Sequence, residues 1–233
     1  MNRLDAARMG VAFSMQILRH EVRDDRFIRI IEDFARLVVS SEDACARAME
    51  SGRDDFADAV ISTETDYLED LIGAIFLMLQ TKIRRVGVAA CETSEALTAG
   101  HGAAKRWPDA RAVRAESGNY KNTGHPLIEL VWAVGNYFKH QDEWAHDVWT
   151  PQGNSRDVKT RKMVEAVGIV ESSTGNMRTA LAFLGVDPHS CGKLAQDVQN
   201  WADEILRSAE AVQFKASRQA QESAGSTAGG STV

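Results

Sequence analysis

The sequence contains little cysteine and little proline, and both shortages narrow the classes of protein it can belong to. Its three cysteines, Cys45, Cys91 and Cys191, are far apart, and none belongs to a Cys-x-x-Cys pair. This spacing argues against a zinc site and against disulfide exchange. Only four prolines occur in 233 residues, which is compatible with long helices because proline breaks a helix interior.

Long apolar segments are also missing. The longest, LIGAIFLML at residues 71–79, has about half the length that a bilayer crossing requires. The N-terminus has acidic residues among its basic ones and no uninterrupted apolar stretch with a small-residue cleavage site, unlike a secretion signal. We therefore expect a cytoplasmic protein that does not enter a membrane.

The net charge of -6 is unevenly distributed along the chain. Residues 80–162 carry 13 Lys and Arg against 9 Asp and Glu, which is +4, whereas the remaining residues carry 14 against 24, which is -10. A basic middle on an acidic protein is compatible with a patch that binds a polyanion. A solvated surface of mixed charge is the commoner explanation of such a window.

Apolar residues recur at helical spacing almost throughout, and strand-like alternation is scarce. The clearest pattern predicts a helix over residues 62–90, with a stripe formed by Leu68, Leu71, Ile72, Ile75, Phe76, Leu79, Ile83 and Val86. We expect two helices before it, over residues 4–19 and 24–49. The stripe of the second comprises Phe27, Ile30, Ile31, Phe34, Leu37 and Val38.

Residues 98–125 are rich in glycine and basic residues and predict a long connection with one short helix. Four further helices are expected over residues 126–144, 156–171, 177–184 and 187–217, the third of them closed by Gly185. Together these patterns predict an all-α, multi-helix bundle of about six to seven helices. We expect residues 1–217 to form one domain and the polar residues 218–233 to form a disordered tail.

Several catalytic motifs are absent. The sequence has no Gly-x-x-x-x-Gly-Lys, no His-Glu-x-x-His and no Gly-x-Ser-x-Gly. The segment GHGAAK at residues 100–105 lacks the third glycine of a dinucleotide fingerprint and follows an expected helix rather than a strand. The sequence therefore does not support nucleoside triphosphate hydrolysis, zinc proteolysis or an esterase mechanism, and we expect no cofactor.

The segment GNYFKHQDEW at residues 135–144 concentrates polar and aromatic side chains. On the helix predicted over residues 126–144, the side chains divide between two opposite faces. The face predicted to be buried contains Leu127, Leu130, Val131, Val134 and Phe138. The opposite face contains Glu129, Trp132, Asn136, His140 and Glu143, which places Asn136, His140 and Glu143 within reach of one another.

This polar face has three interpretations. In the first it is structural, with solvated carboxylates and a histidine that caps the helix. In the second His140 acts as an acid, a base or a phosphate contact, held by Asn136 and Glu143, and Trp132 is covered by a ligand, a helix or a second subunit. The third is a metal site with His125, His146, Asp142 or Asp147, for which the spacing of the histidines is unfavourable, so we expect no metal.

The long amphipathic helix TDYLEDLIGAIFLMLQTKIRRV, the polar connection and the later segment NYFKHQDEW resemble the HEPN superfamily, named for higher eukaryotes and prokaryotes nucleotide-binding proteins. The resemblance covers about residues 25–170. It implies a HEPN-like bundle that dimerises through the helix bearing the histidine, in a prokaryotic defence or stress response. Active members of the family resemble metal-independent ribonucleases that use an arginine followed, after four to six residues, by a histidine.

The arginine of that signature is absent, because the three positions that could hold it for His140 are Ala133, Val134 and Gly135. The resemblance transfers only Asn136 and His140, with Lys139 as a neighbouring cation. Two functions therefore stay open, a binding or regulatory module for RNA, a nucleotide or a partner protein, and a divergent ribonuclease that uses His140. In both cases we expect a homodimer with Trp132, Glu129 and Glu143 at its interface.

Overall fold

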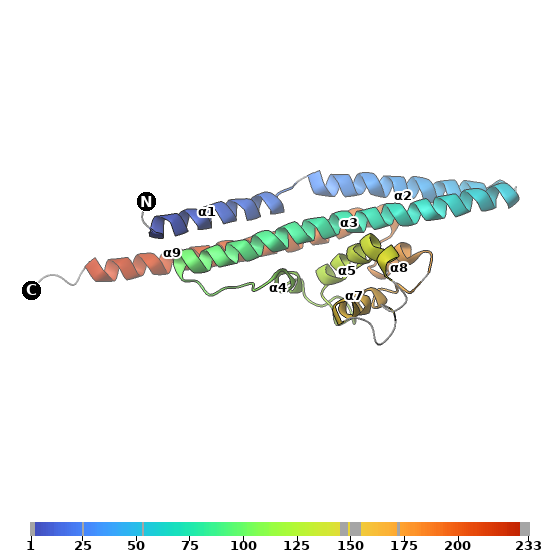
Figure 1. The fold of residues 1–233 in the computed structure, drawn as a ribbon. Coiled ribbons are helices and arrows are strands. Elements are labelled where there is room, and N and C mark those ends of the chain that lie inside the picture. The colour runs from blue at the N-terminus through green and yellow to red at the C-terminus, as the bar shows by residue number, and fades with distance from the viewer. Residues whose placement is uncertain are drawn as a thin grey trace, which may run out of the picture. The chain divides into compact units, whose positions relative to one another are not determined.

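The computed structural model describes residues 3–228 except residues 25, 53, 145–148, 150–154 and 172. Within this part the chain forms helices and no β-strand, apart from one isolated bridge between Asn119 and Pro126. The prediction of an all-α, multi-helix bundle is therefore confirmed (Figure 1). In the same part of the chain, no helix is both long and apolar enough to span a membrane.

The bounds of the helices agree with the prediction at most ends. They are α1 (Arg3–Val22), α2 (Arg26–Glu50), α3 (Asp54–His101), α4 (Ala110–Ala115), α5 (Leu127–His140), η1 (Gln141–Glu143), α7 (Ser155–Glu165), α8 (Asn176–Phe183), η2 (Pro188–Ser190) and α9 (Cys191–Ala228). The long connection before α5 contains the single short helix that its composition predicts.

The largest differences from the prediction are in three helices. Helix α3 is longer at both ends, and α9 continues to Ala228, beyond the predicted end near Ser217. Helix α7 stops at Glu165 instead of Glu171 because Gly168 adopts φ +86, and the Ile169 N–H donates to the Val164 carbonyl at 3.0 Å. This is the glycine-terminated arrangement that commonly ends helices. Disorder of residues 218–233 stays a prediction, and residues 229–233 of that tail lie outside the described part.

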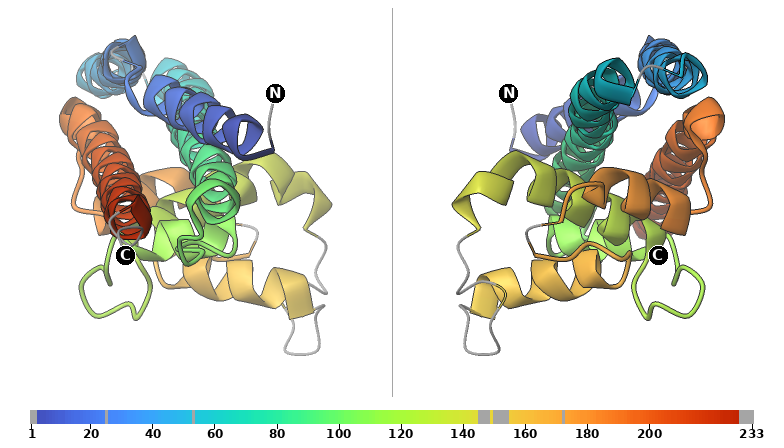
Figure 2. Two further views of the ribbon diagram at one scale, coloured as in Figure 1. Left: turned by 90° about the vertical axis from the view of Figure 1, so that its left-hand side faces the viewer. Right: turned by 90° about the vertical axis from the view of Figure 1, so that its right-hand side faces the viewer.

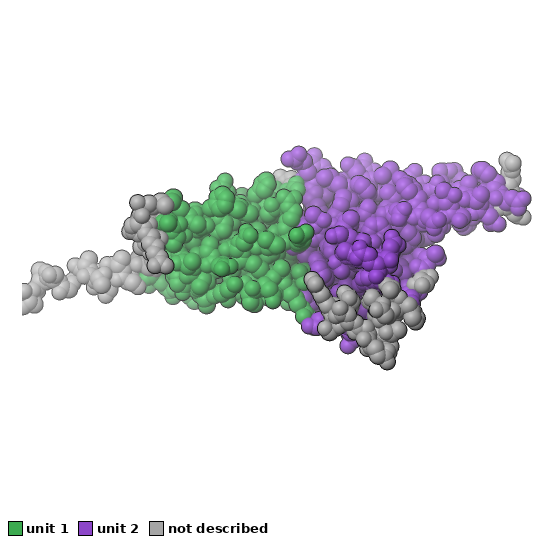
Figure 3. Space-filling view, viewed as in Figure 1, with its two compact units in different colours: residues 1–24, 84–116, 199–233 green, residues 25–83, 117–198 purple. Residues whose placement is uncertain are grey.

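The chain forms two compact units, coloured separately in Figure 3. Unit 1 contains Met1–Asp24, Arg84–Glu116 and Gln199–Val233, and unit 2 contains Asp25–Ile83 and Ser117–Val198. The boundaries fall inside α3 and α9, so both helices contribute to both units. A single domain over residues 1–217 stays a prediction.

Unit 1 is built on an antiparallel pair formed by α1 and the second half of α3. Thr93 Oγ1 donates to the Ser14 carbonyl at 3.1 Å, and Arg85 pairs with Glu21 at 2.7 Å. Trp107 is fully buried, as expected for a core anchor, and its Nε1 donates to Glu116 at 3.0 Å. The first two contacts join helices that are distant in sequence, and Trp107 adds a large aromatic side chain to the core of the unit.

Unit 2 begins with a second antiparallel pair, formed by α2 and the first half of α3. The Ser41 hydroxyl donates to the Glu64 carboxylate, and Lys82 Nζ lies 5.4 Å from the ring centroid of Phe27. All eight residues of the predicted α3 stripe are buried. The predicted α2 stripe is partly wrong, because Ile30 and Leu37 are each 46% exposed.

Helix α5 packs closely against α3 in unit 2, and two glycines permit the approach. A Cβ on Gly135 would lie 2.7 Å from the Phe76 carbonyl oxygen and 2.8 Å from Gln80 Cβ. A Cβ on Gly73 would lie 2.1 Å from a ring carbon of Phe138. Gly73 of α3 therefore lies against the Phe138 ring of α5, and Gly135 of α5 lies against the α3 backbone. Helix α7 lies beside α5 (Figure 2), and α8 also contacts it.

This packing predicts opposite effects for two Gly→Ala substitutions. Gly135→Ala should lower the free energy of unfolding by about 1–3 kcal/mol, because the added methyl meets the α3 backbone. Gly10→Ala is the matched control, because a Cβ there meets nothing within 4 Å, and it should stabilise by about 0.4–1 kcal/mol. Urea unfolding followed by circular dichroism measures both, and equal effects of the two substitutions would contradict the packing described.

Candidate functional site at the end of helix α5

The segment singled out by the sequence occupies the second half of α5 and the short helix η1. Most of α5 is buried, because α3, α7 and α8 contact it within the same unit. Glu129, which the sequence places on the polar face, is only 4% exposed and is therefore not a solvated carboxylate. Trp132 on the same face is half-buried. The exposed positions begin at Lys139 and continue through η1 to Glu143.

His140 and Glu143 form the ionisable pair of this exposed end. His140 Nδ1 lies 2.9 Å from Glu143 Oε2, and the two side chains are 32% and 73% exposed. A carboxylate at Nδ1 favours the tautomer with its proton on Nδ1, which makes Nε2 the hydrogen-bond acceptor. His140 is also the last residue of α5, where the helix dipole favours positive charge. The pair can therefore hold or accept a proton at the protein surface.

Asn136 does not complete this pair in the way that its spacing predicts. Its Oδ1 lies 3.5 Å from Gln80 Nε2 on α3, a long hydrogen bond. The structure thus brings together His140 and Glu143 and directs Asn136 towards α3. Lys139 is exposed beside His140 and supplies the positive charge of this segment.

The three positions at which the HEPN signature would place an arginine all lie in the packed part of α5. Ala133 and Val134 are fully buried, and Gly135 contacts the α3 backbone as described above. A guanidinium group on any of these positions would require a cavity that the helix packing does not leave. The packing around α5 is therefore consistent with the absence of an arginine at these three positions.

Sequence reasoning missed a buried polar network next to the site. Asn176, at the start of α8, is 5% exposed, and its Nδ2 donates to the Tyr137 hydroxyl at 3.0 Å and to the Val170 carbonyl at 2.9 Å. Its Oδ1 accepts the Val170 N–H at 3.1 Å. Burial raises the pKa of the Tyr137 hydroxyl, and the hydrogen bond from Asn176 partly offsets that increase. The network fixes α8 against α5.

Tyr137 also begins an aromatic cluster. Its ring contacts Trp144 and Trp149 edge to face, with centroid distances of 5.2 and 6.1 Å, and the two tryptophans are 5.6 Å apart. Both tryptophans are half-buried. The cluster therefore packs Trp144 and Trp149 against Tyr137 of α5.

Helix α8 is held at both ends by distant residues. The Glu69 carboxylate on α3 accepts the backbone N–H groups of Met177 at 2.7 Å and Arg178 at 3.2 Å. At the other end, the Tyr120 hydroxyl donates to the Leu184 carbonyl at 2.7 Å, and Lys121 Nζ donates to the Phe183 carbonyl at 2.9 Å. An eight-residue helix is too short to be stable alone, so these contacts determine its position.

Among the described residues, no three His, Cys, Asp or Glu side chains gather in a way that could hold a metal ion. His146 and Asp147, considered above as metal ligands, lie outside the described part.

Comparison with known proteins adds no assignment, since no protein-family model, curated protein or solved structure matches the chain. The fold and the site thus define an all-α helical bundle with an exposed His–Glu pair at one helix end.

Two Asn→Ala substitutions should separate the structural asparagine from the exposed site. Asn176→Ala leaves buried polar groups of Tyr137 and Val170 without their partner, and should cost about 1–3 kcal/mol of unfolding free energy. Asn136→Ala removes one long hydrogen bond and should cost less than about 1 kcal/mol. Chemical unfolding measures both values. A larger loss for Asn136→Ala than for Asn176→Ala would show that Asn136 is the structural residue.

Proposed function

We propose that the protein is a HEPN-like helical binding module that contacts phosphate groups of RNA or a nucleotide at the exposed end of α5, without cleaving them. The observation that carries this proposal is the burial of positions 133–135. In the resembling family these positions supply the arginine of the catalytic pair. Lys139 and His140 are both accessible to an anion.

Binding and cleavage place different demands on this surface. A phosphate contact needs a positive charge and a hydrogen-bond donor, which Lys139 and protonated His140 supply. Cleavage needs, in addition, a cation fixed where negative charge develops on the phosphorane. An exposed lysine on a flexible stem is poorly preorganised for that second role. The geometry therefore favours binding.

A divergent ribonuclease is the second candidate, and the His140–Glu143 pair favours it. In that reaction His140 Nε2 would remove the proton of a ribose 2′-hydroxyl while its Nδ1–H stays bonded to Glu143. The 2′-oxygen would then attack the adjacent phosphorus, the bond to the 5′-oxygen would break, and a proton would pass to that leaving oxygen. Lys139 would be the nearest cation in sequence.

The proposal includes a homodimer in a prokaryotic defence or stress response. Its interface would have to use the accessible end of α5 and η1, because Glu129 is buried within its own chain. A partner protein bound to the same end is the alternative occupant.

The test is the binding of a short fluorescein-labelled single-stranded RNA, measured by anisotropy in EDTA. Lys139→Ala and His140→Ala should each weaken binding by roughly threefold, because each removes one phosphate contact. Lys215→Ala on the exposed surface of α9 removes the same charge and should leave the affinity unchanged. The fold of each variant is checked by circular dichroism.

Gel analysis of the same RNA decides between the two candidates. The binding module predicts intact RNA after prolonged incubation. RNA cleavage that persists in EDTA and disappears in His140→Ala would establish the ribonuclease instead. Equal binding by wild type and both variants would contradict the assignment of this surface, and would direct attention to a protein partner.

A further inference from the structure

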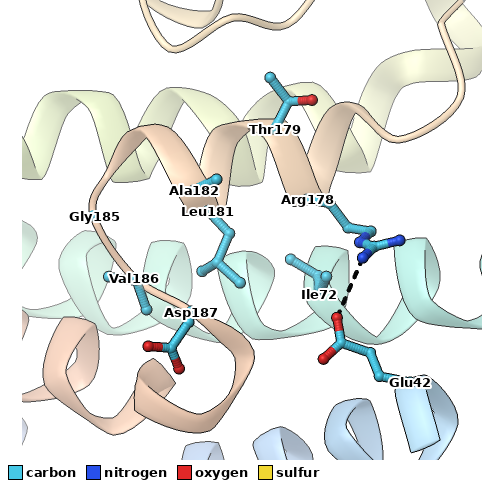
Figure 4. A pocket seen from close by; sticks show the side chains of 9 residues that line it. All are labelled: Glu42, Ile72, Arg178, Thr179, Leu181, Ala182, Gly185, Val186 and Asp187. Carbon is cyan, nitrogen blue, oxygen red and sulfur yellow. Dashed lines mark hydrogen bonds and ion pairs between the residues drawn. The ribbon is translucent and has the colours of Figure 1, made fainter. Parts of the chain in front are cut away.

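Unit 2 contains a cavity of about 600 Å³, within the usual size range of small-molecule sites. It lies between α2, α3, α8 and the segment that leads from α8 to η2 (Figure 4). None of the residues discussed at the end of α5 lines it.

The base of the cavity is apolar and its two ends are charged. Ile72 and Leu181 lie between Arg178 and Glu42 at one end and Asp187 at the other (Figure 4). Val186 adds a second apolar surface beside Asp187. Arg178 and Gly185 are separated by about 10 Å along the helix direction. The cavity is therefore long enough for a ligand with an apolar body and one polar end.

The charges of the lining residues do not balance. Arg178 pairs with Glu42 at 3.3 Å, so these two side chains largely neutralise each other. Asp187 then leaves a net charge of -1, from two acidic side chains and one basic side chain. Burial raises the pKa of the neighbouring Cys191 thiol to about 11, and the charges of Asp187 and Glu42 add to the increase.

The end of the cavity that carries Asp187 is structurally fixed. Gly185 adopts φ +71, which turns the chain out of α8, and the Tyr120 hydroxyl holds the neighbouring Leu184 carbonyl. The Asp187 N–H donates to Ser190 Oγ at 3.1 Å, and the Ser190 N–H donates to the Asp187 carbonyl at 2.9 Å. The backbone that carries the carboxylate is therefore held before any ligand arrives.

We propose that this cavity binds a small organic monocation, an alkylammonium group whose charge faces Asp187 and whose apolar stem lies along the exposed side of α8 at Ala182. An anion is disfavoured because the one basic side chain of the lining is already paired with Glu42. A neutral apolar ligand would leave Asp187 without a counter-charge among the lining residues.

The test compares three probes of similar shape and different charge, namely pentylamine, pentanol and pentanoate, by chemical-shift titration at neutral pH. Pentylamine should bind more tightly than pentanol, and pentanoate should not shift the signals of residues that line the cavity. Equal binding of pentylamine and pentanol, tighter binding of pentanoate, or no binding of any probe would each overturn the proposal.

Two variants are expected to change the affinity for pentylamine in opposite directions, which makes the test specific. Asp187→Asn should weaken pentylamine binding by about two- to fivefold, the range of a partly exposed ion pair. Arg178→Gln should strengthen it, because the competing positive charge is removed. Stronger binding by Asp187→Asn and weaker binding by Arg178→Gln would overturn the proposal.

A steric variant tests the location. Ala182→Leu enlarges an exposed lining residue of α8 and should abolish pentylamine binding, whereas Ala46→Leu on the exposed surface of α2 should not. Both changes leave a good helix former in a helix, and circular dichroism checks the fold. Retained binding in folded Ala182→Leu would place the amine elsewhere.

Discussion

Helix α5 approaches α3 so closely that neither Gly73 nor Gly135 has room for a side chain. Most other features of unit 2 depend on this contact. It brings Phe138 onto α3 and the α3 backbone onto α5, and α7 and α8 then pack against the remaining surface of α5. Close packing of this kind leaves little tolerance for added atoms, because protein interiors have few voids.

The same contact limits the chemistry available to the protein. Because α5 is buried along most of its length, its ionisable side chains reach solvent only at the C-terminal end. There His140 has Glu143 as its partner, and residues 133–135, earlier in the same helix, are buried. The structure thus favours an exposed contact site over an enclosed catalytic centre, since catalysis by charge stabilisation depends on groups fixed in a site that excludes water.

Features of the structure that depend on a local sequence pattern could be predicted from the sequence. All eight residues of the α3 stripe are buried as predicted, and Gly185 ends α8 as its position indicates. The i, i+3 pairing of His140 with Glu143 was also predictable from helix geometry. These features depend on residues that are close together in the chain.

Features that depend on distant residues could not be predicted. No local signal connects Glu69 with the start of α8, or Asn176 with Tyr137, because each pair is joined only by the tertiary fold. Ile30 and Leu37 read as core residues because a period of 3.6 identifies an apolar stripe but not its exact centre. The burial of Glu129 could not be predicted either, because helical spacing does not show which elements cover α5.

The central claim is that the α3–α5 contact leaves no space for a side chain at Gly135, one of the three positions from which an arginine could pair with His140 in the HEPN signature. Replacement of Gly135 by arginine tests it most directly, with Gly10→Arg as the control at an open helical glycine. Thermal unfolding followed by circular dichroism should show that Gly135→Arg has lost the cooperative transition, while Gly10→Arg keeps it. A Gly135→Arg variant that unfolds like the wild type and cleaves RNA in EDTA would contradict the account.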